Sequence, residues 1–154
     1  MDILNIVKLV VTGTLATGGF AIFFSIKPKH IPLAVIGGAL ATLVYAIMDE
    51  LGVDLFISNF LASLACVVYS NVLARMLKTP SIVFITASII PLVPGGSLFY
   101  TMGSLILGNT EMAKSYGLST LKVALGIAGG IVIESLVVLI MTKLVNGKKT
   151  MDTE

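Results

Sequence analysis

The chain has 154 residues, of which 56% are hydrophobic and only 12% are charged, and its formal net charge is +2. Because a soluble domain carries roughly 25% charged residues, this composition excludes an ordinary soluble protein. It predicts an all-α integral membrane protein with a single transmembrane domain over residues 1–154. The small net charge argues against a nucleic-acid partner, and the single cysteine excludes a disulfide within the chain.

Five apolar segments are long enough to cross a bilayer, which takes roughly 20 helical residues per crossing. We predict helices, because no open strand can satisfy its backbone in lipid. The segments cover approximately residues 3–26, 31–48, 55–74, 80–107 and 121–145. A basic turn, Lys27 to His30, follows the first segment, an acidic turn follows the second, and a polar connector, Asn109 to Ser119, precedes the last. The lipid bilayer is therefore the first partner that the sequence predicts.

Lysine and arginine are unevenly shared between the two ends of these segments. With the N-terminus outside, seven of them lie at inner ends and three at outer ends. The positive-inside rule then predicts a multi-pass protein of the cell (plasma) membrane, with its N-terminus outside and its C-terminus cytoplasmic. A re-entrant fourth segment would reverse the later spans. In this arrangement His30 is expected to be solvated in the inner turn, and Lys122 is expected to extend toward the outer interface.

The fourth segment carries the strongest helix breakers in the sequence. It lies in an uncharged run of 32 residues, Thr79 to Thr110, which as one helix would be about 48 Å long, against a hydrocarbon core of about 30 Å. Pro91 and Pro94 lack an N–H and clash with the preceding turn. We predict two half-helices, broken at Pro94-Gly95-Gly96, with Ser97 as the N-cap of the second. A packing kink with a satisfied backbone is the alternative.

The amino end of the second half-helix is a candidate anion site. The first N–H groups of a helix have no intrahelical partner, and with the dipole they present about half a positive charge. A carboxylate or phosphate can bind there without lysine or arginine. The candidate solute-binding residues are Pro94, Gly95, Gly96, Ser97 and Tyr100, with Asn59 from the third segment. For Asn59, interhelical hydrogen bonding is the alternative role.

Glu134 is the one acid well inside an apolar segment. A charge at mid-membrane costs at least about 3 kcal/mol on insertion scales, so this side chain should face the bundle interior or be protonated. Its spacing places it on the same side of the helix as Gly126 and Gly130, which form a G-x-x-x-G pattern. We regard Glu134 as a candidate proton carrier. A structural hydrogen bond to a neighbouring helix is the alternative.

The sequence lacks the motifs of common catalytic and metal sites. It contains one His and one Cys, with no H-E-x-x-H or C-x-x-C spacing and no Walker-type phosphate loop. We therefore predict no enzyme activity, no metal site and no cofactor.

The string Pro91-Leu92-Val93-Pro94-Gly95-Gly96-Ser97-Leu98-Phe99-Tyr100 resembles the signature of the threonine/serine exporter family. Over roughly residues 5–145 the chain is similar to the small, membrane-only subunit of the split type. The resemblance implies a secondary exporter for threonine and serine or a related small carboxylate such as succinate. It also implies a larger membrane subunit of the same family as a partner in a hetero-oligomer. The alternatives are a non-catalytic assembly or scaffold subunit of that complex, and an uncoupled channel.

Overall fold

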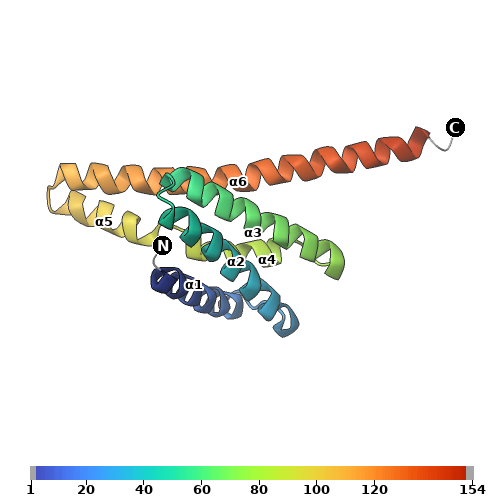
Figure 1. Ribbon diagram of the computed structural model, residues 1–154, viewed down its shortest axis with the longest axis horizontal. Helices are drawn as coiled ribbons and strands as arrows, with labels where there is room; N and C mark the ends of the chain where they lie inside the picture. The colour runs from blue at the N-terminus through green and yellow to red at the C-terminus, as the bar shows by residue number, and fades with distance from the viewer. Residues whose placement is uncertain (1–2, 152–154) are drawn as a thin grey trace.

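Residues 3–151 are described by the computed structural model, and they form helices joined by short turns, with no strand in that range (Figure 1). The elements are α1 (Ile3–Phe23), η1 (Pro28–His30), α2 (Ile31–Glu50), α3 (Leu55–Leu77), α4 (Ile82–Ile89), η2 (Ile90–Leu92), α5 (Gly95–Ile106) and α6 (Thr110–Met151). Among the described residues, four helices are long and apolar enough to cross a membrane, or five if the bent pair formed by α4 and α5 is one span. The predicted all-α membrane class is confirmed.

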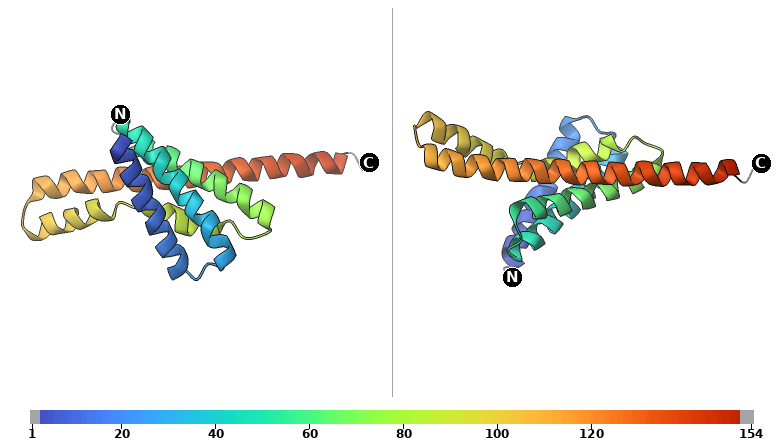
Figure 2. Two further views of the ribbon diagram at one scale, coloured as in Figure 1. Left: turned by 60° about the horizontal axis from the view of Figure 1, so that its bottom comes forward. Right: turned by 90° about the horizontal axis from the view of Figure 1, so that it is seen from above.

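The last helix is longer than the sequence suggested. The prediction of a polar connector over Asn109 to Ser119 is wrong, because α6 runs unbroken for 42 residues from Thr110. Asn109 caps this helix, since its side-chain oxygen accepts from the Met112 N–H at 3.2 Å. Glu111 in the first turn complements the helix dipole. At 1.5 Å per residue α6 is about 63 Å long, and α3 and α5 pack along this rod (Figure 2).

Small residues bring the helices into close contact. A Cβ added at Gly13 of α1 would clash with the Thr42 side chain of α2, and a Cβ at Gly38 of α2 would clash with Thr17 of α1. In the first pair the glycine comes from α1 and the threonine from α2, and in the second pair the two are exchanged. In lipid, such close approach drives helix association through van der Waals contact. The small-residue faces of α1 and α2 are therefore used within the chain.

The short helix α4 is anchored in the bundle. Phe84 and Ala87 are fully buried, and the Ser88 hydroxyl donates to the Ala34 carbonyl of α2 at 2.8 Å. A Cβ at Gly37 of α2 would lie 2.6 Å from the Ser88 oxygen, so the two helices are in direct contact there. These contacts hold the carboxyl end of α4 against α2, just before the chain leaves the bundle core.

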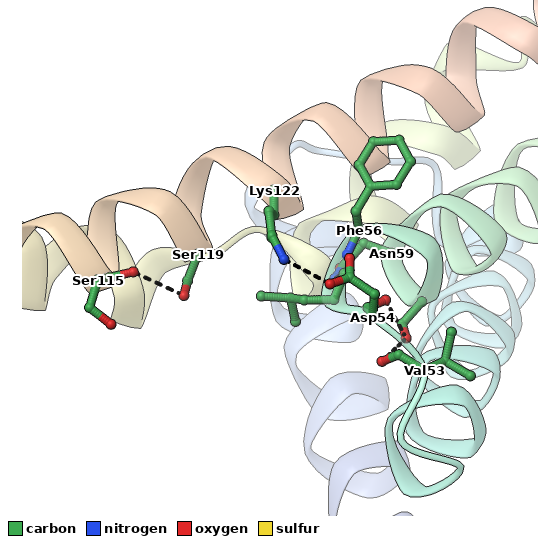
Figure 3. A network of polar contacts seen from close by, with 9 residues as sticks. Val53, Asp54, Phe56, Asn59, Ser115, Ser119 and Lys122 are labelled. Carbon is green, nitrogen blue, oxygen red and sulfur yellow. Dashed lines mark hydrogen bonds and ion pairs between the residues drawn. The ribbon is translucent and has the colours of Figure 1, made fainter.

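Polar contacts at the amino end of α3 join it to α6. Asp54 caps α3 by accepting from the Phe56 N–H at 2.9 Å, and its other carboxylate oxygen pairs with the Lys122 ammonium of α6 at 2.7 Å (Figure 3). The Lys122 ammonium, with the Phe56 N–H, holds the pKa of Asp54 below its ordinary value. Lys122 therefore pairs with α3, a partner that the sequence did not identify.

Candidate functional site

The helix break is real, but it lies slightly earlier than the sequence predicted. α4 with η2 meets α5 at a bend of 51°. Val93 has extended backbone (φ −63°, ψ 130°), and Pro94 (φ −77°, ψ 55°) occupies the N-cap position of α5. The residue before a proline is pushed away from helical geometry, so Val93 leaves the helix. Gly95 is already helical, and the predicted break over residues 94–96 is corrected to Val93–Pro94.

Ser97 does not cap the second half-helix, contrary to the prediction. It is the third residue of α5, and no side chain caps that helix. Its carbonyl accepts from the Thr101 hydroxyl at 2.7 Å. The N-cap residue Pro94 has no side-chain acceptor. The first N–H groups of α5 therefore lack the hydrogen bond that a serine N-cap would accept.

Two amides at this end are bare. The Gly95 N–H donates to the Val93 carbonyl at 2.8 Å, and the Leu98 N–H donates to the Pro94 carbonyl at 3.0 Å. Within residues 3–151, no acceptor faces the N–H groups of Gly96 and Ser97. A Cβ added at Gly95 or Gly96 would meet nothing within 4 Å, so access to these amides is open. The arrangement provides two donors and the positive end of a 12-residue helix.

A cavity of about 390 Å³ lies against the break. It is bounded by α1, α2, α3, α6 and the segment between α4 and α5. Of the predicted site residues, Pro94, Ser97 and Asn59 line it, whereas Gly95 and Gly96 are exposed and lie outside the lining. The Asn59 side chain is only 1% exposed, and its amide nitrogen donates to the Leu55 carbonyl at 2.8 Å. The fold thus brings Asn59 beside the break, 35 residues away in sequence from Pro94.

Tyr100 lies elsewhere. It is absent from the lining of this cavity and is 56% exposed. Its ring contacts Phe99 and Tyr116, with centroid separations of 5.7 and 5.4 Å. The structure therefore places Tyr100 in the α5–α6 contact, outside the cavity lining.

Sequence reasoning missed the polar residues that α1 and α2 contribute to this cavity. Thr12 comes from α1, and Thr42 and Tyr45 come from α2. Each is a hydroxyl-bearing residue in a mainly apolar helix, which was the available signal. The lining contains no lysine, arginine, aspartate or glutamate among the described residues. The cavity therefore carries polar side chains in a mainly apolar lining, without a formal charge.

Glu134 occupies a separate site on the α3–α6 interface. It is 5% exposed, and its carboxylate accepts from the Asn71 side-chain amide of α3 at 2.6 Å. The predicted shared side with Gly126 and Gly130 is confirmed, because Cβ atoms at both glycines would collide with α3 backbone. A cavity of about 570 Å³ lies nearby, lined by Asn71 and by Ser135, the residue after Glu134.

The two sites are well separated along α6. Val123 lines the cavity at the break, and Glu134 is eleven residues further on, about 16 Å along the helix axis. Glu134 therefore does not contact a solute bound at the break. No group of three metal-ligating side chains occurs in the described part of the chain.

Comparison with known proteins yields one result. Residues 9–137 match the family model described as Threonine/Serine exporter, ThrE. No curated protein and no solved structure matches the chain significantly.

Proposed function

Because the chain belongs to the threonine/serine exporter family, we propose that it is a membrane subunit of a secondary exporter for threonine, serine or a related small carboxylate such as succinate. A larger membrane subunit of the same family is its proposed partner. Family membership points to a transporter rather than an enzyme. The observation that carries the proposal is the pair of bare amides at Gly96 and Ser97, of which Ser97 lines a cavity that has polar but no charged side chains.

The amides suit a carboxylate that must be released again. Two N–H groups and a helix dipole hold an anion without a fixed full charge. Transporters commonly place half-helix amino ends at substrate carboxylates in this way. Because the lining offers no lysine or arginine, the bound anion is not trapped in a strong ion pair.

The threonine and tyrosine hydroxyls can bind the ammonium and hydroxyl groups of the solute. The Thr42 hydroxyl donates to the Gly38 carbonyl at 2.9 Å, so its oxygen keeps lone pairs that can accept from a solute ammonium or hydroxyl. The Thr12 oxygen likewise keeps lone pairs, since its hydroxyl donates to the Lys8 carbonyl at 2.8 Å. We propose that these oxygens, with Tyr45 and Asn59, favour small polar solutes over apolar ones.

The α5–α6 hairpin supports the proposed partner. From the Asp54–Lys122 pair, α6 runs back twelve residues to Thr110, so the hairpin extends about 18 Å past the amino end of α3 (Figure 1). Its apolar side chains are exposed, with Phe99 at 72% and Ile106 at 84%. A hairpin that leaves its own bundle with exposed apolar side chains offers a surface on which a second membrane chain can pack.

The test is transport in liposomes. A complex of the chain with its larger partner should move radiolabelled threonine, serine or succinate, and the partner alone should not. Equal flux without the chain would support the alternative of a scaffold subunit with solute handled by the partner. Flux that ignores the proton gradient would support an uncoupled channel.

Glu134 is proposed to couple this transport to protons. In Glu134→Gln the side-chain oxygen can still accept from Asn71, so the α3–α6 contact should persist while the titratable group is lost. We expect flux that no longer responds to an imposed proton gradient. The readout is solute uptake with and without a pH step across the liposome membrane.

The matched control is Ser135→Ala, which changes the exposed neighbour in the sequence of α6. It should keep the response to the proton gradient. If Glu134→Gln keeps that response as well, Glu134 is a structural hydrogen-bond partner of Asn71 and carries no proton.

A further inference from the structure

We infer that the end of the bundle opposite the acidic turn carries a second binding site, which takes the oxyanion headgroup of a membrane phospholipid. A cavity of about 670 Å³ lies between the turn that joins α1 to α2 and the turn that joins α3 to α4. Lys27, Lys29 and Lys78 line it together with His30. No acidic side chain of the described residues is part of the lining. Three ammonium groups without a counter-ion around one hollow favour an anion.

His30 provides the second, independent observation. The sequence predicted a solvated histidine, and that prediction is wrong, because the side chain is only 5% exposed. Its ring lies edge-on to Phe84, with centroids 5.5 Å apart. Its Nδ1 is buried and has no hydrogen-bond partner among the described residues. Buried polar atoms are nearly always paired, so this nitrogen is an unsatisfied polar group on a residue that lines the cationic cavity.

The backbone of both turns is shaped around this cavity. Ser25 (φ 53°) and Lys78 (φ 50°) are the described non-glycine residues with left-handed backbone, and both line the cavity. Lys78 ends α3 in this conformation, with its N–H donating to the Ala74 carbonyl. Each position closes a helix in the usual way, since the next N–H, of Ile26 or Thr79, donates to the carbonyl five residues back, at Ala21 or Ala74. Here the two positions set the geometry of the turns that carry the lysines.

The rest of the lining selects a lipid over a small free anion. Phe24, Ile82 and Val83 form an apolar wall beside the lysines, and Phe24 and Ile82 are exposed. A cationic rim next to an apolar wall matches a phospholipid, whose phosphate and acyl chains would lie against these two parts. Basic pockets between membrane helices bind anionic headgroups in this manner. A free phosphate or carboxylate shares the oxyanion but leaves the apolar wall uncovered.

Native mass spectrometry of the full-length chain in detergent tests the site. The probe is dioleoyl-phosphatidylglycerol, with dioleoyl-phosphatidylcholine as the neutral-headgroup comparison and inorganic phosphate as the free oxyanion. The variant Lys27→Gln/Lys78→Gln should bind phosphatidylglycerol about thirtyfold more weakly, the loss expected for two lysines near an anionic headgroup. The control Lys8→Gln/Lys114→Gln removes the same charge from exposed positions outside this cavity and should bind like the wild type.

A second variant addresses His30 alone. His30→Phe keeps an aromatic ring against Phe84 and all three lysines but removes the buried nitrogen. It should weaken phosphatidylglycerol binding while the lipid-free unfolding temperature stays at the wild-type value. Equal loss of phosphatidylglycerol in the two double variants would overturn the site, since it would reflect general surface charge. Displacement of the lipid by inorganic phosphate at comparable concentration would overturn the assignment to a phospholipid.

Discussion

Replacing Gly96 by leucine should reduce solute flux by about ten- to a hundredfold while leaving the fold intact. The new side chain enters open space, because a Cβ at Gly96 meets nothing within 4 Å. It would cover the amides of Gly96 and Ser97 with hydrocarbon and remove at least one hydrogen bond to the solute carboxylate. A hydrogen bond to a charged group is worth about 1.5–3 kcal/mol, which corresponds to this loss of affinity. Uptake of threonine or succinate into liposomes that contain the complex is the measurement.

Gly103 supplies the matched control for this substitution. It lies in the same helix, α5, and a Cβ there also meets nothing within 4 Å. Because Gly103 is two turns from the amino end, Gly103→Leu should add the same bulk without touching the bare amides. If Gly96→Leu and Gly103→Leu transport equally well, the solute does not use the amino end of α5.

Replacing Gly130 by alanine should destabilise the chain by on the order of 2 kcal/mol, through overpacking of the α3–α6 interface. An alanine usually stabilises a helix interior by about 1 kcal/mol relative to glycine. Here the added Cβ would lie 2.7 Å from the Phe60 carbonyl and 2.9 Å from the Leu64 nitrogen, and it would also collide with Ser63. Two of these obstacles are backbone of α3, which cannot move aside as a side chain can, so the steric cost prevails. Denaturant unfolding in detergent, followed by helical content, measures the effect.

Gly129, the neighbouring glycine on α6, tests whether the collision with α3 backbone is the cause. A Cβ at Gly129 would meet only the Phe60 ring, with its nearest atom at 3.3 Å, and a ring can rotate. Gly129→Ala should therefore cost much less than Gly130→Ala. Equal stability of the two variants would mean that α3 and α6 do not approach as closely as their glycines indicate.

The sequence predicted the helix break because its cause is local. Pro91 and Pro94 lack an N–H and clash with the preceding turn, which kinks or breaks a helix. The predicted break began one residue late and ended two residues late, for an equally local reason. Proline restricts the residue before it, so Val93 leaves the helix, whereas Gly95 and Gly96 can adopt helical angles and begin α5. The sequence pattern predicted that the helix breaks, and backbone sterics determine at which residues it does so.

The features that the sequence did not reveal depend on contacts between distant residues. Asn71 and Glu134 are 63 residues apart, and the partner of Glu134 emerges only when glycines bring α6 onto α3. The burial of His30 depends on Phe84, which comes from α4. The polar stretch before the last span had good helix formers, but only its packing against α5 and the Asn109 cap turned it into part of one long helix.

Amide NMR of the ¹⁵N-glycine-labelled chain, in complex with its partner in nanodiscs, can observe the proposed contact itself. The chain has 15 glycines, so the signals of Gly96 and Gly103 can be assigned by single substitutions. Titration with succinate or threonine should shift the Gly96 amide proton downfield in a saturable manner and leave Gly103 unchanged. A Gly96 amide that stays constant at solute concentrations that saturate transport would show that the bare end of α5 does not hold the solute.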